Sequence, residues 1–164
     1  MLKRFLIIAL LALLGGNRSN AQTEAGKTTS DGHFFVAPGV ATCCGRGEGI
    51  MQVGGGAEGT FYRGIGMNMD AGYMFPISSA GAGILTLSGG PMYQFNRSRK
   101  TVPFITGGAS LAVRSGVGGA FHFGGGAIHW FRPRWGLRFE VRDHMAAGNA
   151  GNHLLIFRVG LARR

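Results

Sequence analysis

Charged side chains recur at alternate positions in the segment 135–143, where Arg138, Glu140 and Arg142 are separated by apolar residues. Successive side chains of a β-strand point to opposite faces, so these three charges share one face. Their chemistry is ion pairing, which is stable away from water only when each charge has a partner. In a water-soluble sheet this face would lie in solvent, whereas in a membrane barrel it would line a polar lumen and the apolar face would contact lipid.

The same alternation in other segments assigns further charges to the polar face. Segments 135–143 and 153–163 are neighbours in an up-and-down barrel, so Arg158 would be within reach of Glu140. The collected residues comprise three acids and four bases, the near balance that a closed lumen requires. We predict a lumen charge network of Glu58, Asp70, Arg114, Arg138, Glu140, Arg142 and Arg158.

The serine and histidine side chains that could act in catalysis or bind a metal form no recognisable site in the sequence. A serine hydrolase would need a serine, a histidine and an acid in contact, and no spacing fixes a serine beside a histidine. Residues 54–59 fit the spacing GxGxxG, but that motif requires a following helix and here predicts only a glycine-rich strand. The candidates considered are Ser110, Ser115, His122, His129, His144 and His153. The sequence therefore predicts no catalytic residue, no metal site and no cofactor.

The two cysteines, Cys43 and Cys44, are adjacent and fall in the first predicted loop. In an oxidising compartment they are a candidate disulfide, either with each other as a strained ring or with partners elsewhere. The sequence leaves these pairings open. Because no CxxC spacing or histidine cluster accompanies them, a metal site is not expected here.

Residues 1–21 have the pattern of a secretory signal peptide. A basic start precedes an unbroken apolar run over 5–14, and the small residues Ser19 and Ala21 mark a cleavage site. The run is shorter than the about 20 residues that a spanning helix needs. Export argues against a nucleic-acid partner, although the formal net charge of +10 would otherwise allow one. Residues 22–32 are polar and small, which predicts a flexible lead.

The rest of the chain, 33–164, reads as one β-domain. Most of the 31 glycines of the chain are spread through β-prone segments of this domain, where they indicate bends, bulges or close backbone contacts of the kind that small, strongly curved barrels need. The alternation has a period of two, and no amphipathic helix is evident. We predict an all-β, eight-stranded, antiparallel, up-and-down transmembrane barrel. Its strands are predicted at 33–42, 48–61, 64–75, 81–95, 101–114, 117–131, 135–143 and 153–163.

Aromatic residues gather at the rim where even-numbered segments end and odd-numbered segments begin. Aromatic rings favour a membrane interface, where one edge is apolar and the other is wet. The turns at this rim are basic and would meet phospholipid phosphates on the periplasmic side or be merely solvated. The predicted interface aromatics are Phe61, Tyr62, Tyr93, Phe95, Trp130 and Trp135.

Segment 117–131 does not follow one parity. Phe121 and Phe123 fall on one face, whereas Ile128 and Trp130 fall on the other. A bulge at the intervening glycine triplet would restore the register. Without a bulge, one of the two pairs faces inward.

From about residue 33 to residue 163 the chain resembles the small eight-stranded outer-membrane β-barrel proteins of Gram-negative bacteria, the OmpA/OmpX-like group. The resemblance rests on the signal peptide, the eight alternating segments and local stretches such as 102–108 and 136–144. It implies residence in the outer membrane and assembly by the barrel-insertion machinery. The chain departs from the group at its end, where Arg163 and Arg164 stand in place of a terminal aromatic residue.

These observations lead us to expect a non-enzymatic outer-membrane barrel with a side-chain-filled, salt-bridged lumen and a structural or membrane-integrity role. Its expected partners are outer-membrane lipids and the insertion machinery, not nucleic acid, and the protein is expected to be monomeric. Two alternatives remain open. One is a secreted, soluble, lipocalin-like barrel that binds a small apolar ligand. The other is a lipid-modifying barrel enzyme that depends on His144 or His153.

Overall fold

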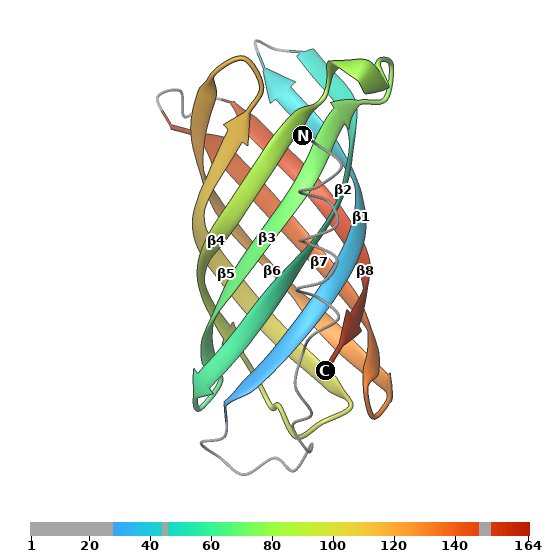
Figure 1. Ribbon diagram of the computed structural model, residues 1–164, viewed down its shortest axis with the longest axis vertical. Helices are drawn as coiled ribbons and strands as arrows, with labels where there is room; N and C mark the ends of the chain where they lie inside the picture. Colours follow the sequence, from blue (N-terminus) through green and yellow to red (C-terminus); the bar gives the residue numbers. More distant parts are fainter. Residues whose placement is uncertain (1–27, 44–45, 148–151) are drawn as a thin grey trace, which may run out of the picture.

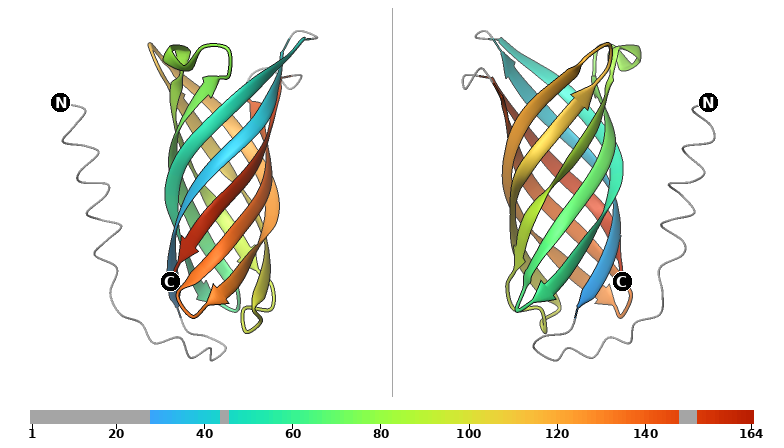
Figure 2. Two further views of the ribbon diagram at one scale, coloured as in Figure 1. Left: turned by 90° about the vertical axis from the view of Figure 1, so that its right-hand side faces the viewer. Right: turned by 60° about the vertical axis from the view of Figure 1, so that its left-hand side comes forward.

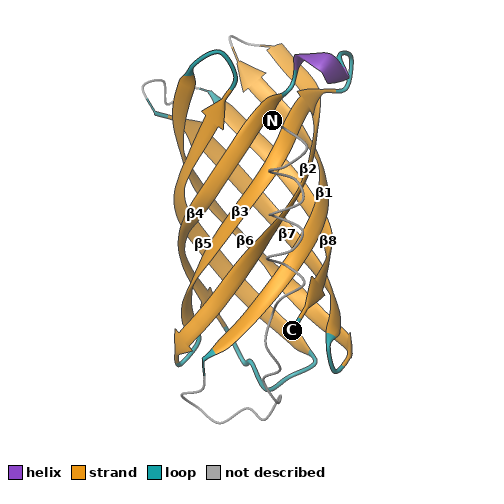
Figure 3. Ribbon diagram, viewed as in Figure 1, coloured by secondary structure: helices purple, strands orange, loops and turns teal. Residues whose placement is uncertain are grey.

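The computed structural model describes residues 28–43, 46–147 and 152–164, which form a closed barrel of antiparallel strands (Figures 1 and 3). The elements are β1 (Thr29–Cys43), β2 (Arg46–Tyr62), β3 (Ile65–Pro76), the 3₁₀ helix η1 (Ala80–Ala82), β4 (Ile84–Gln94), β5 (Thr101–Val113), β6 (Val117–Arg132), β7 (Trp135–Ala146) and β8 (His153–Arg163). Each strand pairs with the next along the chain, and β1 pairs with β8 to close the sheet. The predicted all-β, eight-stranded, up-and-down barrel is confirmed. Within the described ranges, no helix is long and apolar enough to cross a bilayer.

Strand β1 begins earlier than the sequence suggested. It starts at Thr29, inside the predicted flexible lead 22–32, because Thr29 pairs with Thr60 of β2 and their hydroxyl oxygens lie 2.6 Å apart. The buried Asp31 follows in the same strand. The end of the predicted lead is therefore part of the sheet.

Two other bounds differ for local reasons. β7 continues past the predicted end at Asp143, because β6 is long enough to pair with it as far as Ala146. β4 begins at Ile84 because η1 occupies the preceding residues. The predicted signal peptide 1–21 lies outside the described residues. The candidate disulfide of Cys43 and Cys44 also falls outside them, because neither side chain is described.

The barrel has two distinct ends. Strands β1 and β8 place Thr29 and Arg163 at the same end, which we call the terminal rim (Figure 2). The turns there are 63–64, 95–100 and 133–134, and the opposite end, the distal rim, carries the other connections. Outer-membrane barrels have short turns on the periplasmic side, so the terminal rim corresponds to the predicted periplasmic rim.

The distribution of polarity is inverted relative to a water-soluble protein. On β7, Phe139 is 49% exposed and Val141 is 43% exposed on the outside, whereas the intervening Arg138 and Arg142 are 1% and 0% exposed inside. The other strands show the same alternation, with large apolar side chains outside. A lipocalin-like soluble carrier would need a wet exterior and an apolar interior. The structure is therefore that of a transmembrane barrel, and the lipocalin-like alternative is wrong.

Of the two alternatives for β6, a bulge at the glycine triplet or an inward-facing apolar pair, the structure shows the second. The β6–β7 ladder is regular through residues 124–126, and its irregularity lies at the terminal-rim turn, after Trp130. A Cβ atom on Gly126 would meet the carbonyl oxygen of Phe139 and the Cα atom of Glu140. Glycine is therefore required where β6 and β7 approach so closely inside the curved wall.

Because the register is continuous, one pair of apolar residues in β6 must face inward. Ile128 is fully buried and Trp130 is 7% exposed, whereas Phe121 and Phe123 lie outside. The prediction that Trp130 is an interface aromatic is therefore wrong. Its ring is covered on the inside by the Arg164 guanidinium, whose carbon lies 3.7 Å from the ring centroid.

Candidate functional site

The middle of the lumen contains a belt of charged side chains from four strands. Strand β7 places Arg138, Glu140 and Arg142 inward at alternate positions, as strand geometry dictates. Arg158 lies opposite Glu140 on β8. The remaining two belt members are Glu58 on β2 and Asp70 on β3.

Glu140 is the centre of the belt. Its Oε1 atom accepts hydrogen bonds from Arg142, with Nε at 2.7 Å and Nη2 at 2.6 Å. Its Oε2 atom lies 3.3 Å from both Nε and Nη2 of Arg138 and 4.0 Å from Nη1 of Arg158. One carboxylate therefore serves three guanidinium groups, and its side chain is completely shielded from solvent.

Each arginine also has a second carboxylate. Arg142 donates to Asp70 at 3.0 Å, and Arg158 donates to the other oxygen of Asp70 at 3.0 Å. Arg138 donates to Glu58. The belt therefore contains three arginines and three carboxylates, and this balance offsets the cost of burying charge.

The predicted network contained one residue too many. Six of its seven members lie in the belt, but Arg114 is exposed in the turn after β5. Its position has the inward parity, yet the strand ends at Val113, so parity no longer decides its direction. Without Arg114, the described lumen belt is electrically balanced.

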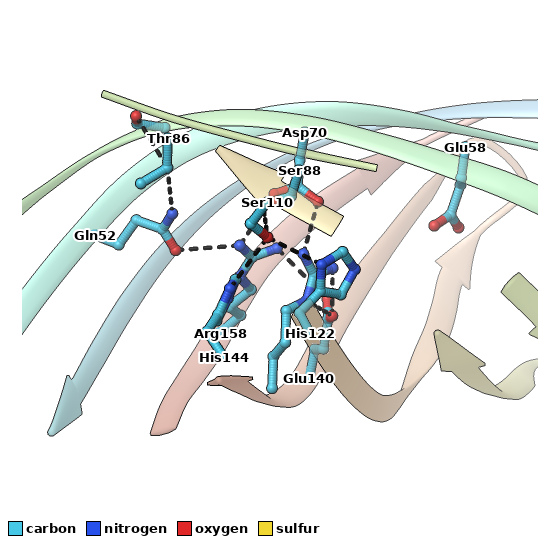
Figure 4. Close-up of polar contacts among 12 residues, drawn as sticks. Gln52, Glu58, Asp70, Thr86, Ser88, Ser110, His122, Glu140, His144 and Arg158 are labelled. Atoms are coloured by element: carbon cyan, nitrogen blue, oxygen red, sulfur yellow. Dashed lines mark hydrogen bonds and ion pairs between the residues drawn. The ribbon is translucent and has the colours of Figure 1, made fainter. Parts of the chain in front are cut away.

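Neutral polar side chains extend the belt towards β2 and β4 (Figure 4). Arg158 donates to Oε1 of Gln52 at 3.1 Å, and Nε2 of Gln52 donates to Thr86 at 2.8 Å. Gln94 donates to Glu58 at 3.1 Å. These contacts were not assigned from the sequence, although the two glutamines share the polar parity of their strands.

A second polar cluster joins Ser110 on β5 to two histidines. His122 and His144 are directly paired across β6 and β7, and their Nδ1 atoms lie 2.9 and 3.2 Å from the Ser110 hydroxyl. Ser110 also donates to Ser88 at 2.9 Å. Sequence spacing did not bring these residues together, because contacts across three strands depend on their register. The signal that could have found them is their common inward parity.

This cluster has part of the geometry of nucleophilic catalysis, but a substrate in the membrane could not reach it. A serine beside a histidine is the first requirement for a serine hydrolase. Ser110, His122 and His144 are all buried inside the barrel, away from the lipid-facing surface. Among the described residues, no group of three or more His, Cys, Asp or Glu side chains is placed to hold a metal ion.

Of the remaining histidines, His33 on β1 is buried inside the barrel at 2% exposure, whereas His129 and His153 lie outside the lumen. His153 faces outward near the distal rim, with its Nδ1 atom 2.9 Å from Asp143 Oδ2. His129 is exposed, and its Nδ1 lies 2.9 Å from the Thr101 hydroxyl. The GxGxxG stretch at 54–59 lies within β2 and is not followed by a helix.

Apolar clusters lie on both sides of the charged belt. Towards the terminal rim the cluster consists of Met92, Val102, Phe104, Ile128, Trp130 and Ala162. The other cluster consists of Phe35, Ala37, Ile50, Met74 and Ile156. Phe104 and Phe35 also contact the belt, because the guanidinium carbons of Arg138 and Arg158 lie 4.0 and 4.2 Å from their ring centroids.

Five of the predicted interface aromatics lie near the terminal rim with exposed or partly exposed rings. Phe61, Tyr62, Tyr93 and Phe95 are exposed on the outside. Trp135 is partly exposed, and the guanidinium carbon of Arg163 lies 5.4 Å from its ring centroid. This arrangement suits the boundary between hydrocarbon and headgroups.

Comparison with known proteins places the fold. No family model matches this chain, and no curated protein matches it. Neisserial surface protein A has a similar structure, with a TM-score of 0.68 at 10% identity over 84% of this chain and 98% of that one. A de novo designed transmembrane β-barrel gives 0.54 at 20% identity over 87% and 97%. The outer membrane enzyme PagL gives 0.51 at 16% identity over 80% and 99%. The chain therefore has the fold of the small eight-stranded β-barrels of bacterial outer membranes, with the inverted polarity that a bilayer requires.

Proposed function

We propose that this chain is a non-enzymatic protein of the bacterial outer membrane with a structural or membrane-integrity role. The observation that carries the proposal is the closed lumen. The side chains of Glu140 and Arg142 have no exposed surface, although they lie in the middle of the barrel. A water-filled channel would leave such groups accessible, as in wide porins.

The two apolar clusters support the same proposal. They lie on either side of the charged belt, so an ion crossing the lumen would have to leave water beside Phe104 or Ile156 and then compete with existing ion pairs. Burial of an unpaired ion is expensive. A lumen built in this way stabilises the barrel wall and does not provide a path for ions across the membrane.

The test is conductance of the refolded mature chain in planar bilayers. We expect no discrete conductance steps, because the belt and both clusters are filled. Insertion is checked in vesicles by heat-modifiable electrophoretic mobility, which separates a closed barrel from a protein that failed to insert. Reproducible steps from the inserted wild-type protein would contradict the proposal.

An enzyme that acts on lipid is the second candidate. It is favoured by the fold shared with PagL, described as an outer membrane enzyme, and by the outward-facing pair of His153 and Asp143. A histidine oriented by a carboxylate is one element of general-base catalysis. A nucleophile activated by His153 would have to donate its proton to the imidazole ring. The adjacent Thr42 hydroxyl instead donates to the backbone carbonyl of His153 at 3.1 Å.

Turnover assays distinguish the two candidates. We expect the folded protein to release no product from phospholipid or lipopolysaccharide. Turnover that disappears in His153→Ala or His144→Ala would favour the enzyme instead.

The proposed partners are membrane lipids and the barrel-insertion machinery, and the proposed oligomeric state is a monomer. Light scattering in detergent tests the oligomeric state.

A further inference from the structure

The exposed charges of the barrel are unevenly distributed between its two rims. The described part of the terminal rim carries eight basic residues: Arg63, Arg97, Arg99, Lys100, Arg132, Arg134, Arg163 and Arg164. The carboxylate towards that rim, Asp31, is buried inside the barrel. The distal rim, by contrast, has two acidic residues, Glu48 and Asp143, and two basic ones, Arg46 and Arg114. The surplus positive charge therefore lies at one membrane surface.

Two of these basic residues, Arg99 and Lys100, line a hollow at the turn between β4 and β5. The turn lies at the lower end of the barrel in Figure 1. The hollow has a volume of about 440 Å³ and is lined by Asn96, Arg99, Lys100, Thr101 and Pro103. The turn is fixed by backbone hydrogen bonds from Arg99 N to Asn96 O at 3.0 Å and from Phe95 N to Pro103 O at 2.8 Å.

The hollow continues into the apolar exterior. Pro103 lies in the hollow and faces outward from β5, and Ile105 follows it on the same face, where it is paired with Tyr93 of β4. Tyr93 and Phe95 form a T-shaped ring pair beside it, with centroids 4.7 Å apart. A cationic end and an apolar end therefore adjoin at the level of the predicted interface, as an anionic amphiphile requires.

We propose that this hollow binds the headgroup phosphate of an anionic glycerophospholipid. Arg99 and Lys100 supply charge to the phosphate, and arginine can donate two parallel hydrogen bonds to it. The acyl chains lie along Ile105 and the Tyr93–Phe95 pair. The position at the edge of the apolar outer surface favours a lipid over free phosphate, because free phosphate has no apolar part that could contact that surface. This inference rests on the proposed membrane residence of the barrel.

The experiment is native mass spectrometry of the folded mature chain, released from micelles doped with phosphatidylglycerol or phosphatidylcholine. We expect preferential retention of one phosphatidylglycerol. The variant Arg99→Gln/Lys100→Gln should lose that preference by at least about thirtyfold, because it removes both cations that line the hollow, and each direct charge-assisted contact to the phosphate is worth more than about 1 kcal/mol. The matched control Arg132→Gln/Arg134→Gln removes the same charge from the same rim and should retain the preference.

Equal losses in the two double variants would overturn the site, because the cause would then be the general field of the rim. The absence of any phosphatidylglycerol preference in the wild-type protein would overturn it as well. Competition by inorganic phosphate at the same concentration as the lipid would assign the hollow to free phosphate and contradict the proposal. Heat-modifiable mobility is measured on every sample. A protein without a folded band would count against the membrane barrel itself, whereas a folded barrel without lipid preference would count against this site alone.

Discussion

Replacing Glu140 with glutamine tests the charged belt most severely, because this carboxylate contacts three arginines. The change keeps the size of the side chain but removes its charge. One of the two oxygens would become an NH₂ group, so a single acceptor oxygen would replace the two that now accept from Arg142 at 2.6 and 2.7 Å and from Arg138 at 3.3 Å. Three buried guanidinium groups would then share the two remaining carboxylates, Glu58 and Asp70.

The expected magnitude follows from this imbalance. Removing one partner from a buried ion pair costs about 3–5 kcal/mol, and most of that cost is the uncompensated charge left behind. Glu48→Gln is the matched control, because Glu48 is exposed and its contact is a 3.4 Å hydrogen bond from Ser78. Surface changes of this kind stay within about 0.5 kcal/mol.

The assay is equilibrium urea unfolding of the refolded barrel in detergent micelles, with a double-mutant cycle. The double variant Glu140→Gln/Arg142→Gln leaves two intact pairs, Arg138 with Glu58 and Arg158 with Asp70. It should therefore lose less stability than the sum of the two single variants, by about 1–3 kcal/mol. Equal losses for Glu140→Gln and Glu48→Gln, or strictly additive losses in the cycle, would refute the belt as a coupled network.

Three further predictions use the same unfolding assay. Gly126→Ala should destabilise the barrel by about 1–3 kcal/mol, because the new methyl group meets the β7 backbone, whereas Gly107→Ala, with 3.6 Å to its nearest atom, should change little. Phe139→Arg, in the middle of the apolar outer surface, should lower the free energy of unfolding by about 2–4 kcal/mol, and Tyr62→Arg, at the terminal rim, by about 0–1 kcal/mol. Equal losses would contradict the depths in the membrane assigned to the two residues. Ser110→Ala should cost about 1–3 kcal/mol by leaving two histidine Nδ1 atoms unpaired, and a neutral result would show that water replaces the hydroxyl.

The fold could be predicted because strand alternation has a direct signature in the sequence. The alternation around Arg138, Glu140 and Arg142 has a period of two, and it assigns each side chain to one wall of the barrel wherever the strand continues. Arg114 shows the limit of this reasoning. It has the inward parity, but the chain turns after Val113 and the side chain enters solvent.

The remaining errors have local physical causes. Glycines carry no side chain to report parity, so residues 124–126 left the direction of Trp130 open, and the aromatic preference for interfaces suggested the wrong side. In the structure, Trp130 packs in the lumen beneath Arg164. The contact of Ser110 with His122 and His144 required the register of three strands, and one sequence does not contain that register.

The central claim is that the apolar face of the barrel contacts lipid, and spin-label accessibility in vesicles tests it most directly. With Cys43 and Cys44 replaced by serine, a nitroxide is attached at Phe139→Cys and, as the aqueous reference, at Arg114→Cys. We expect frequent collisions with oxygen and few with a water-soluble nickel chelate at position 139, and the reverse at position 114. Frequent collisions with the nickel chelate at position 139 in a folded, vesicle-inserted protein would contradict it.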